Sequence, residues 1–318
     1  MNYKSLHRIF KKEQAFLCDM TISHITLCTD NAAVDAYILG KGHAVPVFAD
    51  QFNVPLAQIG SIADGIKDLE FLETPDLGLI GAPANAQPQV KERVAARGGH
   101  VSALETFAAF EEFYAMAGAQ GITHIISDRD GVLKDGKQAW ATEFKELTRE
   151  MGSPGKPYVV VLTGSSLDQN LDFAREYGLD ASLKANSAVR QHPYLLLVEN
   201  GIIAYDVLTG ETRNGVQSLN PELLAKLKGS FEEEVMRQLR KTILPRFGLK
   251  ESVVYDDQRG AVYVAPKEAM VSLNIPREFA DGRKDYRKSP EAEELRQAML
   301  GTMRTAAERV EIAYRILQ

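Results

Sequence analysis

Short, continuous apolar runs alternate with longer amphipathic stretches from residue 24 to residue 206. An interior strand of a parallel sheet is buried on both faces and is written as such a run, whereas amphipathic stretches are typical of surface helices. We interpret as strands the runs at 24–28, 56–62, 77–81, 122–126, 158–162 and 195–206. The alternation predicts an α/β fold with a doubly wound, Rossmann-like parallel sheet.

Helices are predicted between these strands and around them. The stretches concerned are 4–17, 32–38, 40–52, 104–118 and 141–151. Beyond residue 206 the pattern changes to helices at 221–228, at 231–247 and from 290 onward, with strands at 252–255 and 261–264. The length of 318 residues suggests two domains, or one large domain with an insertion.

Polar residues follow the apolar runs where the predicted strands end. Asp128, Asp130 and Gly131 follow the run at 122–126, and Asp64 and Asp68 follow the run at 56–62. The carboxyl ends of parallel strands share one edge of a sheet, which is where such folds carry their chemistry. Carboxylate oxygens at this edge suit a hard cation such as Mg²⁺. The alternative for an isolated Asp-x-Asp-Gly is an acidic turn that merely ends a strand.

Two further segments add groups that suit an anion. Thr163-Gly164-Ser165-Ser166 follows the run at 158–162, and the spacing of Ser165 and Asp168 resembles a helix capping box whose free amides could bind phosphate. Lys41 lies at a predicted helix start, where a cation is unfavourable unless it faces an anion. The alternatives are an ordinary serine-capped helix and a solvated surface lysine.

Composition narrows the class of function. The formal net charge is −6 with scattered lysines and arginines, which argues against a nucleic-acid partner. Cys18 and Cys28 have no metal-ligand spacing and are too few for a disulfide framework, so we expect a cytoplasmic protein. The six histidines show no zinc spacing. No apolar stretch resembles a membrane span or a signal peptide, and the sequence leaves a homo-oligomer open.

The four polar segments together resemble motifs of the haloacid dehalogenase-like superfamily of phosphohydrolases. DRDGV is similar to the first motif, VVVLTGSS to the second, the GKG around Lys41 to the third and IADGIKD to the fourth. LLLVENGIIAYD and GLIGAPANAQPQVKERVA resemble segments of the sugar-phosphatase branch with an α/β cap. The third and fourth motifs precede the first and second here, which implies a circular permutation.

The resemblance implies a domain division and a set of roles. It places a Rossmann-like core at residues 22–202 and the cap at 203–318 together with 1–21. Chain ends of compact domains commonly lie close together, so the permutation is physically reasonable. Lys250, Arg259 and Lys267 of the cap are candidates for sugar or anion contacts, with solvated surface positions as the alternative.

The roles follow from what cleavage of a phosphate ester requires. Asp128 is the expected nucleophile that forms an aspartyl phosphate, and Asp130 the general acid and base. Thr163 and Lys41 would hold the phosphoryl oxygens. The expected Mg²⁺ ligands are Asp128, Asp130 through its backbone carbonyl, Asp64 and Asp68, and the expected substrate contacts are Gly164, Ser165 and Asn200.

The sequence departs from the family pattern in two places. Ala63 and Lys67 replace a glycine and an asparagine of the fourth motif, and Ser165 stands where an arginine is common. Lys67 could pair with an aspartate and weaken metal binding, or it could help to hold an anionic substrate. The expected activity is hydrolysis of a small phosphorylated sugar or sugar-like metabolite. A phosphosugar mutase and a non-catalytic binding protein of the same fold are the alternatives.

Overall fold

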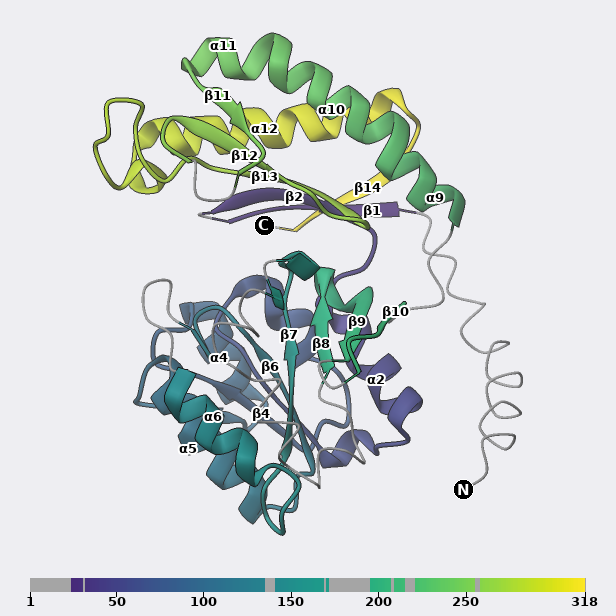
Figure 1. Cartoon of the computed structure of the whole chain (residues 1–318), viewed down its shortest axis with the longest axis vertical. Coiled ribbons are helices and arrows are strands. Elements are labelled where there is room, and N and C mark those ends of the chain that lie inside the picture. The colour runs from purple at the N-terminus through teal and green to yellow at the C-terminus, as the bar shows by residue number, and fades with distance from the viewer. Residues whose placement is uncertain are drawn as a thin grey trace. The chain divides into compact units, whose positions relative to one another are not determined.

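The computed structural model describes residues 24–30, 32–134, 141–168, 170–171, 195–206, 209–214, 221–254 and 258–317 (Figure 1). The chain divides into two compact units, each built on its own sheet. Unit 1 comprises residues 1–38 and 217–318, and unit 2 comprises residues 39–216. The predicted helix at 4–17 and Cys18 lie outside the described residues.

Unit 2 contains an eight-stranded sheet in the order β10-β9-β8-β7-β6-β3-β4-β5. The strands are β3 (Ile59–Ile62), β4 (Leu79–Ala82), β5 (His100–Val101), β6 (His124–Asp128), β7 (Tyr158–Leu162), β8 (Leu195–Val198), β9 (Ile203–Asp206) and β10 (Thr212–Asn214). Neighbours from β8 to β5 pair in parallel, whereas β9 and β10 extend the sheet in antiparallel fashion. The predicted α/β fold with a mainly parallel sheet is confirmed.

The run at 122–126 is an interior strand, as its continuous apolar pattern predicts. Strand β6 pairs in parallel with β7 on one side and with β3 on the other. The strand that leads to Asp64 therefore lies beside the strand that leads to Asp128, although about sixty residues separate them in the chain. This pairing brings the ends of both strands to one edge of the sheet.

Helices pack on both faces of this sheet. Helices of unit 2 that lie wholly within the described residues are α2 (Ala44–Phe52), α3 (Leu69–Leu72), α4 (Pro88–Ala96), α5 (Thr106–Ala119) and α6 (Ala141–Glu150). Phe48 of α2 and Phe71 of α3 join Ile59 of β3 in one buried cluster. Phe113 of α5 packs against Gly60, which points to the opposite face from Ile59 because side chains alternate along a strand. Phe107 of α5 in turn packs edge-to-face on Phe144 of α6.

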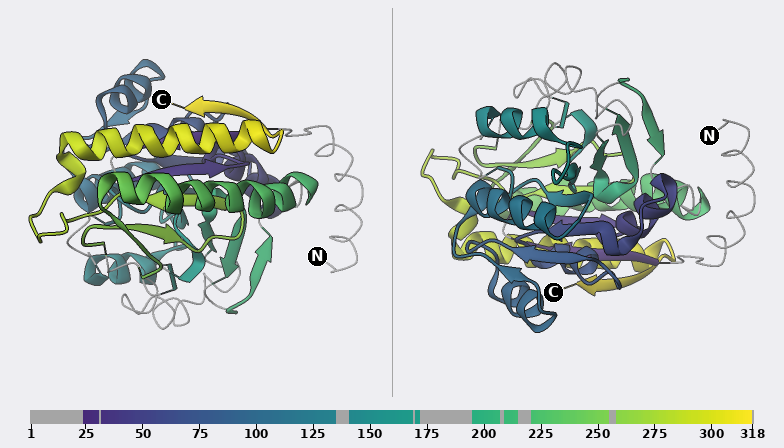
Figure 2. Two further views of the ribbon diagram at one scale, coloured as in Figure 1. Left: turned by 90° about the horizontal axis from the view of Figure 1, so that it is seen from above. Right: turned by 90° about the horizontal axis from the view of Figure 1, so that it is seen from below.

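Unit 1 contains a six-stranded sheet in the order β11-β12-β13-β2-β1-β14. The strands are β1 (His24–Thr29), β2 (Ala33–Tyr37), β11 (Lys250–Ser252), β12 (Ala261–Ala265), β13 (Met270–Asn274) and β14 (Ala313–Leu317). Its helical part comprises α9 (Pro221–Lys226), α10 (Glu232–Gln238), α11 (Leu244–Phe247) and α12 (Pro290–Arg309). Helices α10 and α12 lie side by side (Figure 2).

Several predicted elements are wrong in kind or extent. Residues 32–38 do not form a helix: Ala33–Tyr37 is strand β2, paired with β1 and β13. The run at 195–206 is two strands rather than one, because three consecutive residues with positive φ, Glu199 to Gly201, turn the chain back. The helices predicted at 221–228 and 231–247 form one continuous helical segment that includes two π turns.

The boundaries of the two units also differ from the expected ones. Strands β1 and β2 belong to the sheet of unit 1, so unit 2 begins at residue 39 rather than at 22. The hairpin of β9 and β10 stays with the sheet of unit 2, which therefore extends to residue 216 rather than to 202. Long-range strand pairing decides both boundaries, and a local pattern does not encode it. Among the described residues, no helix combines the length and apolar character of a membrane span.

Candidate functional site

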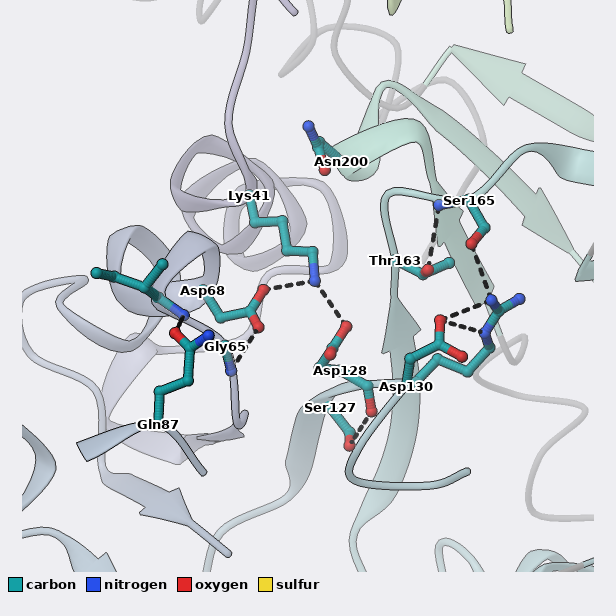
Figure 3. Close-up of polar contacts among 12 residues, drawn as sticks. Lys41, Gly65, Asp68, Gln87, Ser127, Asp128, Asp130, Thr163, Ser165 and Asn200 are labelled. Carbon is teal, nitrogen blue, oxygen red and sulfur yellow. Dashed lines mark hydrogen bonds and ion pairs between the residues drawn. The ribbon is translucent and has the colours of Figure 1, made fainter. Parts of the chain in front are cut away.

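The candidate residues meet where the parallel strands of unit 2 end (Figure 3). Asp128 is the last residue of β6, Thr163 directly follows β7, and Asp64 lies two residues beyond β3. Because these three strands are neighbours and parallel, their carboxyl ends share one edge. The juxtaposition expected at this edge is therefore present for residues that lie far apart in the sequence.

Lys41 connects two of the aspartates directly. Its Nζ lies 2.5 Å from Asp68 Oδ1 and 2.6 Å from Asp128 Oδ1, and it donates a hydrogen bond to each. The three side chains are at most 9 % exposed, so these ion pairs are shielded from water. A surface lysine is thus excluded as the interpretation of Lys41. A buried cation held between two carboxylates fixes the position of both.

The glycines beside Lys41 explain how its side chain reaches the aspartates. Lys41 begins a 3₁₀ turn, Lys41–His43, that leads into α2. A Cβ at residue 42 would lie 2.8 Å from Glu70 Cβ and 2.9 Å from the Glu70 carbonyl oxygen, and one at residue 40 would collide with the Glu70 carboxylate. Glycine at both positions therefore lets this turn pack directly on α3, which begins one residue after Asp68.

Asp64 reaches the same edge from the loop after β3. Its carboxylate occupies the space that a Cβ would take at Gly131, whose φ is +82°. Gln87 holds this loop at two points: its backbone amide donates to Asp64 O at 2.9 Å, and its Oε1 accepts from the amide of Ile66 at 2.8 Å. Asp68 turns back onto the loop and accepts from the Gly65 amide at 3.2 Å. The loop therefore presents both acids to Asp128.

The carboxylates interact strongly with one another. Burial, and then repulsion by Asp68, raises the pKa of Asp64 to about 7. Burial and the neighbouring Asp68 and Asp64 likewise raise the pKa of Asp128 well above its usual range, against the opposing effect of Lys41. For Lys41 burial disfavours the charge, but Asp128 and Asp68 together outweigh it and raise its pKa above the ordinary value. One lysine thus leaves this acidic cluster short of positive charge.

This cluster has the donor set of a cation site. Carboxylate oxygens of Asp64, Asp68 and Asp128 all lie within 4.8 Å of one another. Oxygen donors alone, without histidine or cysteine, suit a hard divalent ion such as Mg²⁺. A bound cation would also relieve the mutual repulsion that, in addition to burial, raises the pKa of Asp64 and Asp128. The three residues could therefore hold such an ion.

Asp130 lies beside this cluster but has a partner of its own. Its charge contributes to the raised pKa of both Asp64 and Asp128, so it lies within electrostatic reach of them. Its Oδ2 accepts two hydrogen bonds from Arg129, at 3.1 Å from Nε and 2.6 Å from Nη2. The Asp130 side chain is 56 % exposed, in contrast to the buried Asp128. Asp130 is therefore the more accessible of the two acids in the Asp-Arg-Asp-Gly segment.

The segments around Thr163 and Asn200 pack on one another. Thr163 Oγ1 accepts from the Ser165 amide at 3.2 Å, and the Thr163 carbonyl accepts from the Asn200 amide at 3.0 Å. Gly164 lies close to Asn200, because a Cβ there would be 3.2 Å from Asn200 Oδ1. Asn200 is buried in a left-handed conformation and donates to the Leu39 carbonyl at 3.4 Å. The expected substrate positions therefore form one continuous group.

Other contacts at the site escaped sequence reasoning. Asn85 donates to the Gly131 carbonyl at 2.9 Å and accepts from the Thr106 amide at 2.8 Å, so it links the turn after β6 to the start of α5. Arg129 and Gln87 were likewise not singled out. The position of Arg129 between Asp128 and Asp130 was the only signal for it in the sequence. Gln87 lies 23 residues after Asp64, and no local pattern indicates its contacts with that loop.

The cap candidates lie in unit 1. Arg259 donates to the Ala280 carbonyl at 3.3 Å, Lys267 Nζ lies 3.8 Å from Met270 Sδ, and Lys250 is exposed at the start of β11. Their contacts with a sugar or an anion remain predictions.

Comparison with known proteins adds no assignment. No protein-family model matches the chain. No curated protein sequence matches it either. Among solved structures, the chain is similar to a mutant form of the Mycobacterium tuberculosis protein Rv3290C, with 10% identity and a TM-score of 0.25 over 98% of this chain and 81% of that one. A likeness this weak supports no inference about fold or function.

Proposed function

We propose that the chain is a Mg²⁺-dependent phosphomonoester hydrolase that acts through an aspartyl-phosphate intermediate. The observation that carries the proposal is the double ion pair of Lys41 with Asp128 and Asp68, beside Asp64, at the strand ends of unit 2. A carboxylate can attack a phosphate dianion only if nearby positive charge reduces their repulsion. A buried lysine and three carboxylates that could hold a cation would meet that requirement.

Asp128 is the nucleophile in this proposal. One of its carboxylate oxygens attacks phosphorus, the bond from phosphorus to the ester oxygen breaks, and the bonding electrons leave with that oxygen. Asp130 donates the proton that the leaving oxygen takes up. Asp130 then removes a proton from water, whose oxygen attacks phosphorus and displaces Asp128, which releases inorganic phosphate.

Lys41 and Thr163 position the reacting groups. Lys41 orients Asp128 through the bond to its Oδ1 and supplies positive charge beside the attacking carboxylate. The Thr163 hydroxyl, already an acceptor for the Ser165 amide, has a proton to donate to a phosphoryl oxygen. Mg²⁺ held by Asp64, Asp68 and Asp128, with the Asp130 carbonyl as a further ligand, would neutralise charge on the phosphoryl group.

The proposed substrate is a small phosphorylated sugar or sugar-like metabolite. The motifs around Asp128, Thr163, Lys41 and Asp64 support the superfamily. The segments LLLVENGIIAYD and GLIGAPANAQPQVKERVA support the sugar-phosphatase branch, with unit 1 as the cap. The order of these motifs along the chain supports a circular permutation. A cytoplasmic location and the absence of nucleic-acid partners belong to the same proposal.

A panel of phosphate esters, assayed with Mg²⁺ and with a chelator, tests the function. We expect Mg²⁺-dependent release of inorganic phosphate that Asp128→Asn reduces by at least about 10³-fold, because the substitution removes the nucleophilic charge at nearly constant shape. If the enzyme returns the phosphoryl group to the sugar and releases no inorganic phosphate, the result would indicate a phosphosugar mutase. Binding of phosphate esters without turnover would indicate the non-catalytic protein.

A further inference from the structure

Arg129 separates the two acids of the segment after β6, and its side chain is only 10 % exposed. A guanidinium is seldom buried unless its N–H groups are paired. The chemistry proposed above uses Asp128 and Asp130 but gives no role to the arginine between them. Its contacts indicate one.

The guanidinium connects Asp130 to the segment after β7. Its Nη2 donates to Ser165 Oγ at 2.8 Å as well as to Asp130, and its Nη1 donates to Asn170 Oδ1 at 2.9 Å. Asn170 is fully buried and donates from Nδ2 to the Ser166 carbonyl at 2.8 Å, so this end of the network is fixed. Ser165 stands where the resembled family commonly has an arginine. Here a guanidinium reaches that position from the neighbouring strand end.

The backbone of Arg129 is fixed as well. Its carbonyl accepts hydrogen bonds from the amides of Leu133 at 3.0 Å and Lys134 at 2.8 Å, which closes the turn that follows Asp130. An arginine held at both its backbone and its guanidinium can impose one orientation on a partner.

Arg129 restricts the orientation of the exposed Asp130 carboxylate. Its Oδ2 accepts both bonds from Arg129, and within the described part of the chain Oδ1 accepts no hydrogen bond from a side chain or the backbone. Without Arg129, an aspartate that is 56 % exposed would rotate among its staggered conformers. With Arg129, Oδ2 is engaged and Oδ1 is the oxygen left to exchange a proton.

We propose that Arg129 is a positioning residue that holds Oδ2 of Asp130 so that Oδ1 transfers protons during ester cleavage. This inference rests on the proposed function. A displacement of about 1 Å at a reacting group can cost about 10²-fold in rate, so the loss of this constraint is measurable.

Leaving-group dependence tests the inference. An ester with a basic leaving group, such as an alkyl phosphate, needs a proton from Asp130 when its bond breaks, whereas p-nitrophenyl phosphate leaves readily without one. We would measure kcat/KM, which reports the steps up to enzyme phosphorylation, for both esters. The proteins are the wild type, Arg129→Gln, Arg129→Lys, Asp130→Asn and the double variant with Arg129→Gln and Asp130→Asn.

We expect Arg129→Gln to lower kcat/KM about 10²-fold for the alkyl phosphate and less than about tenfold for p-nitrophenyl phosphate. Asp130→Asn should show the same selectivity with a loss of about 10²–10⁴-fold on the alkyl phosphate. The double variant should be no slower than Asp130→Asn alone, because the arginine acts through that carboxylate. Arg129→Lys should recover only part of the activity, since one ammonium group cannot bridge Asp130, Ser165 and Asn170.

Arg93→Gln is the matched control, because it removes an arginine that pairs with Glu73 on the surface and is 64 % exposed. This substitution should leave kcat/KM unchanged for both esters. Arg129→Gln could instead lower kcat/KM equally for the two esters, or the losses of the two single substitutions could multiply in the double variant. Either result would mean that Arg129 only supports the turn, and it would overturn the inference. Failure of the wild type to hydrolyse either ester would overturn the proposed function and the inference with it.

Discussion

The carboxylate of Asp64 lies against the α-carbon of Gly131, in the space that a side chain at residue 131 would occupy. The two residues follow neighbouring parallel strands and are far apart in the sequence. Gly131 also has a φ of +82°, a conformation that L-residues rarely adopt. Gly131, in the segment after β6, thus leaves room for the Asp64 carboxylate from the loop after β3.

Gly131→Ala should therefore disable the site. A Cβ would collide with Asp64 and would force an alanine into a left-handed conformation, so we expect a loss of about 2–4 kcal/mol in unfolding free energy. Turnover should fall by at least about 10²-fold, because Asp64 must move. Denaturant unfolding and phosphate release measure both effects.

Gly121→Ala is the control variant, because it introduces the backbone strain of a left-handed alanine without a collision with Asp64. Gly121 has a φ of +77° and no atom within 4 Å of its hypothetical Cβ. This variant should lose about 1–2 kcal/mol and keep its turnover. A Gly131→Ala protein that behaves like Gly121→Ala would contradict the close packing of Gly131 on Asp64.

Lys41→Gln should weaken both the fold and the reaction. It leaves Asp68 and Asp128 buried without their cation, and the removal of one partner from a buried ion pair costs about 3–5 kcal/mol. Turnover should fall about 10²–10³-fold, since positive charge beside the attacking carboxylate is lost. Lys156→Gln, which removes an exposed ion pair with Glu150, should cost at most about 1 kcal/mol. Equal losses for both variants would argue against a special role for Lys41.

The stability of the metal-free protein should depend on pH through Asp64. Its pKa is raised from 3.8 in the unfolded chain to about 7 in the folded protein, mainly by burial. The folded state therefore binds the proton more tightly, and the resulting stability is full below about pH 4 and is lost as the pH rises through about 7. Urea unfolding in the presence of a chelator across this range should show the decline. Asp64→Asn should make the decline shallower, while the raised pKa of Asp128 keeps part of it. An unchanged slope would contradict the raised pKa of Asp64.

Mg²⁺ should stabilise the wild-type protein through the three carboxylates. An ion that binds only the folded state at about 100 times its Kd adds about 2.7 kcal/mol, equivalent to about 5–10 °C in Tm for a unit of this size. Asp68→Asn should lose most of this increment, because it removes one oxygen donor and a negative charge. Thermal unfolding with and without Mg²⁺ measures the effect. An equal increment in both proteins would place the ion elsewhere.

The sequence alone determined the class of the fold and most of the polar residues that meet at this edge of the sheet. Continuous apolar runs specified the strands around Ile126 and Val160, because burial on both faces of a sheet requires apolar residues at every position. The polar residues directly after those runs, among them Asp128 and Thr163, were therefore assigned to one edge of the sheet. This inference needs only that the strands be parallel, which is a consequence of the alternation with helices.

Only the tertiary structure decided which groups pair within that edge and which strands belong to which unit. Ala33–Tyr37 is a strand because β13, more than two hundred residues later, pairs with it. The contacts of Arg129 with Ser165 and of Gly131 with Asp64 likewise join segments that no local pattern relates. Hydrophobic periodicity records how deeply a residue is buried, whereas its partner depends on how distant strands pair and where the loops between them are held.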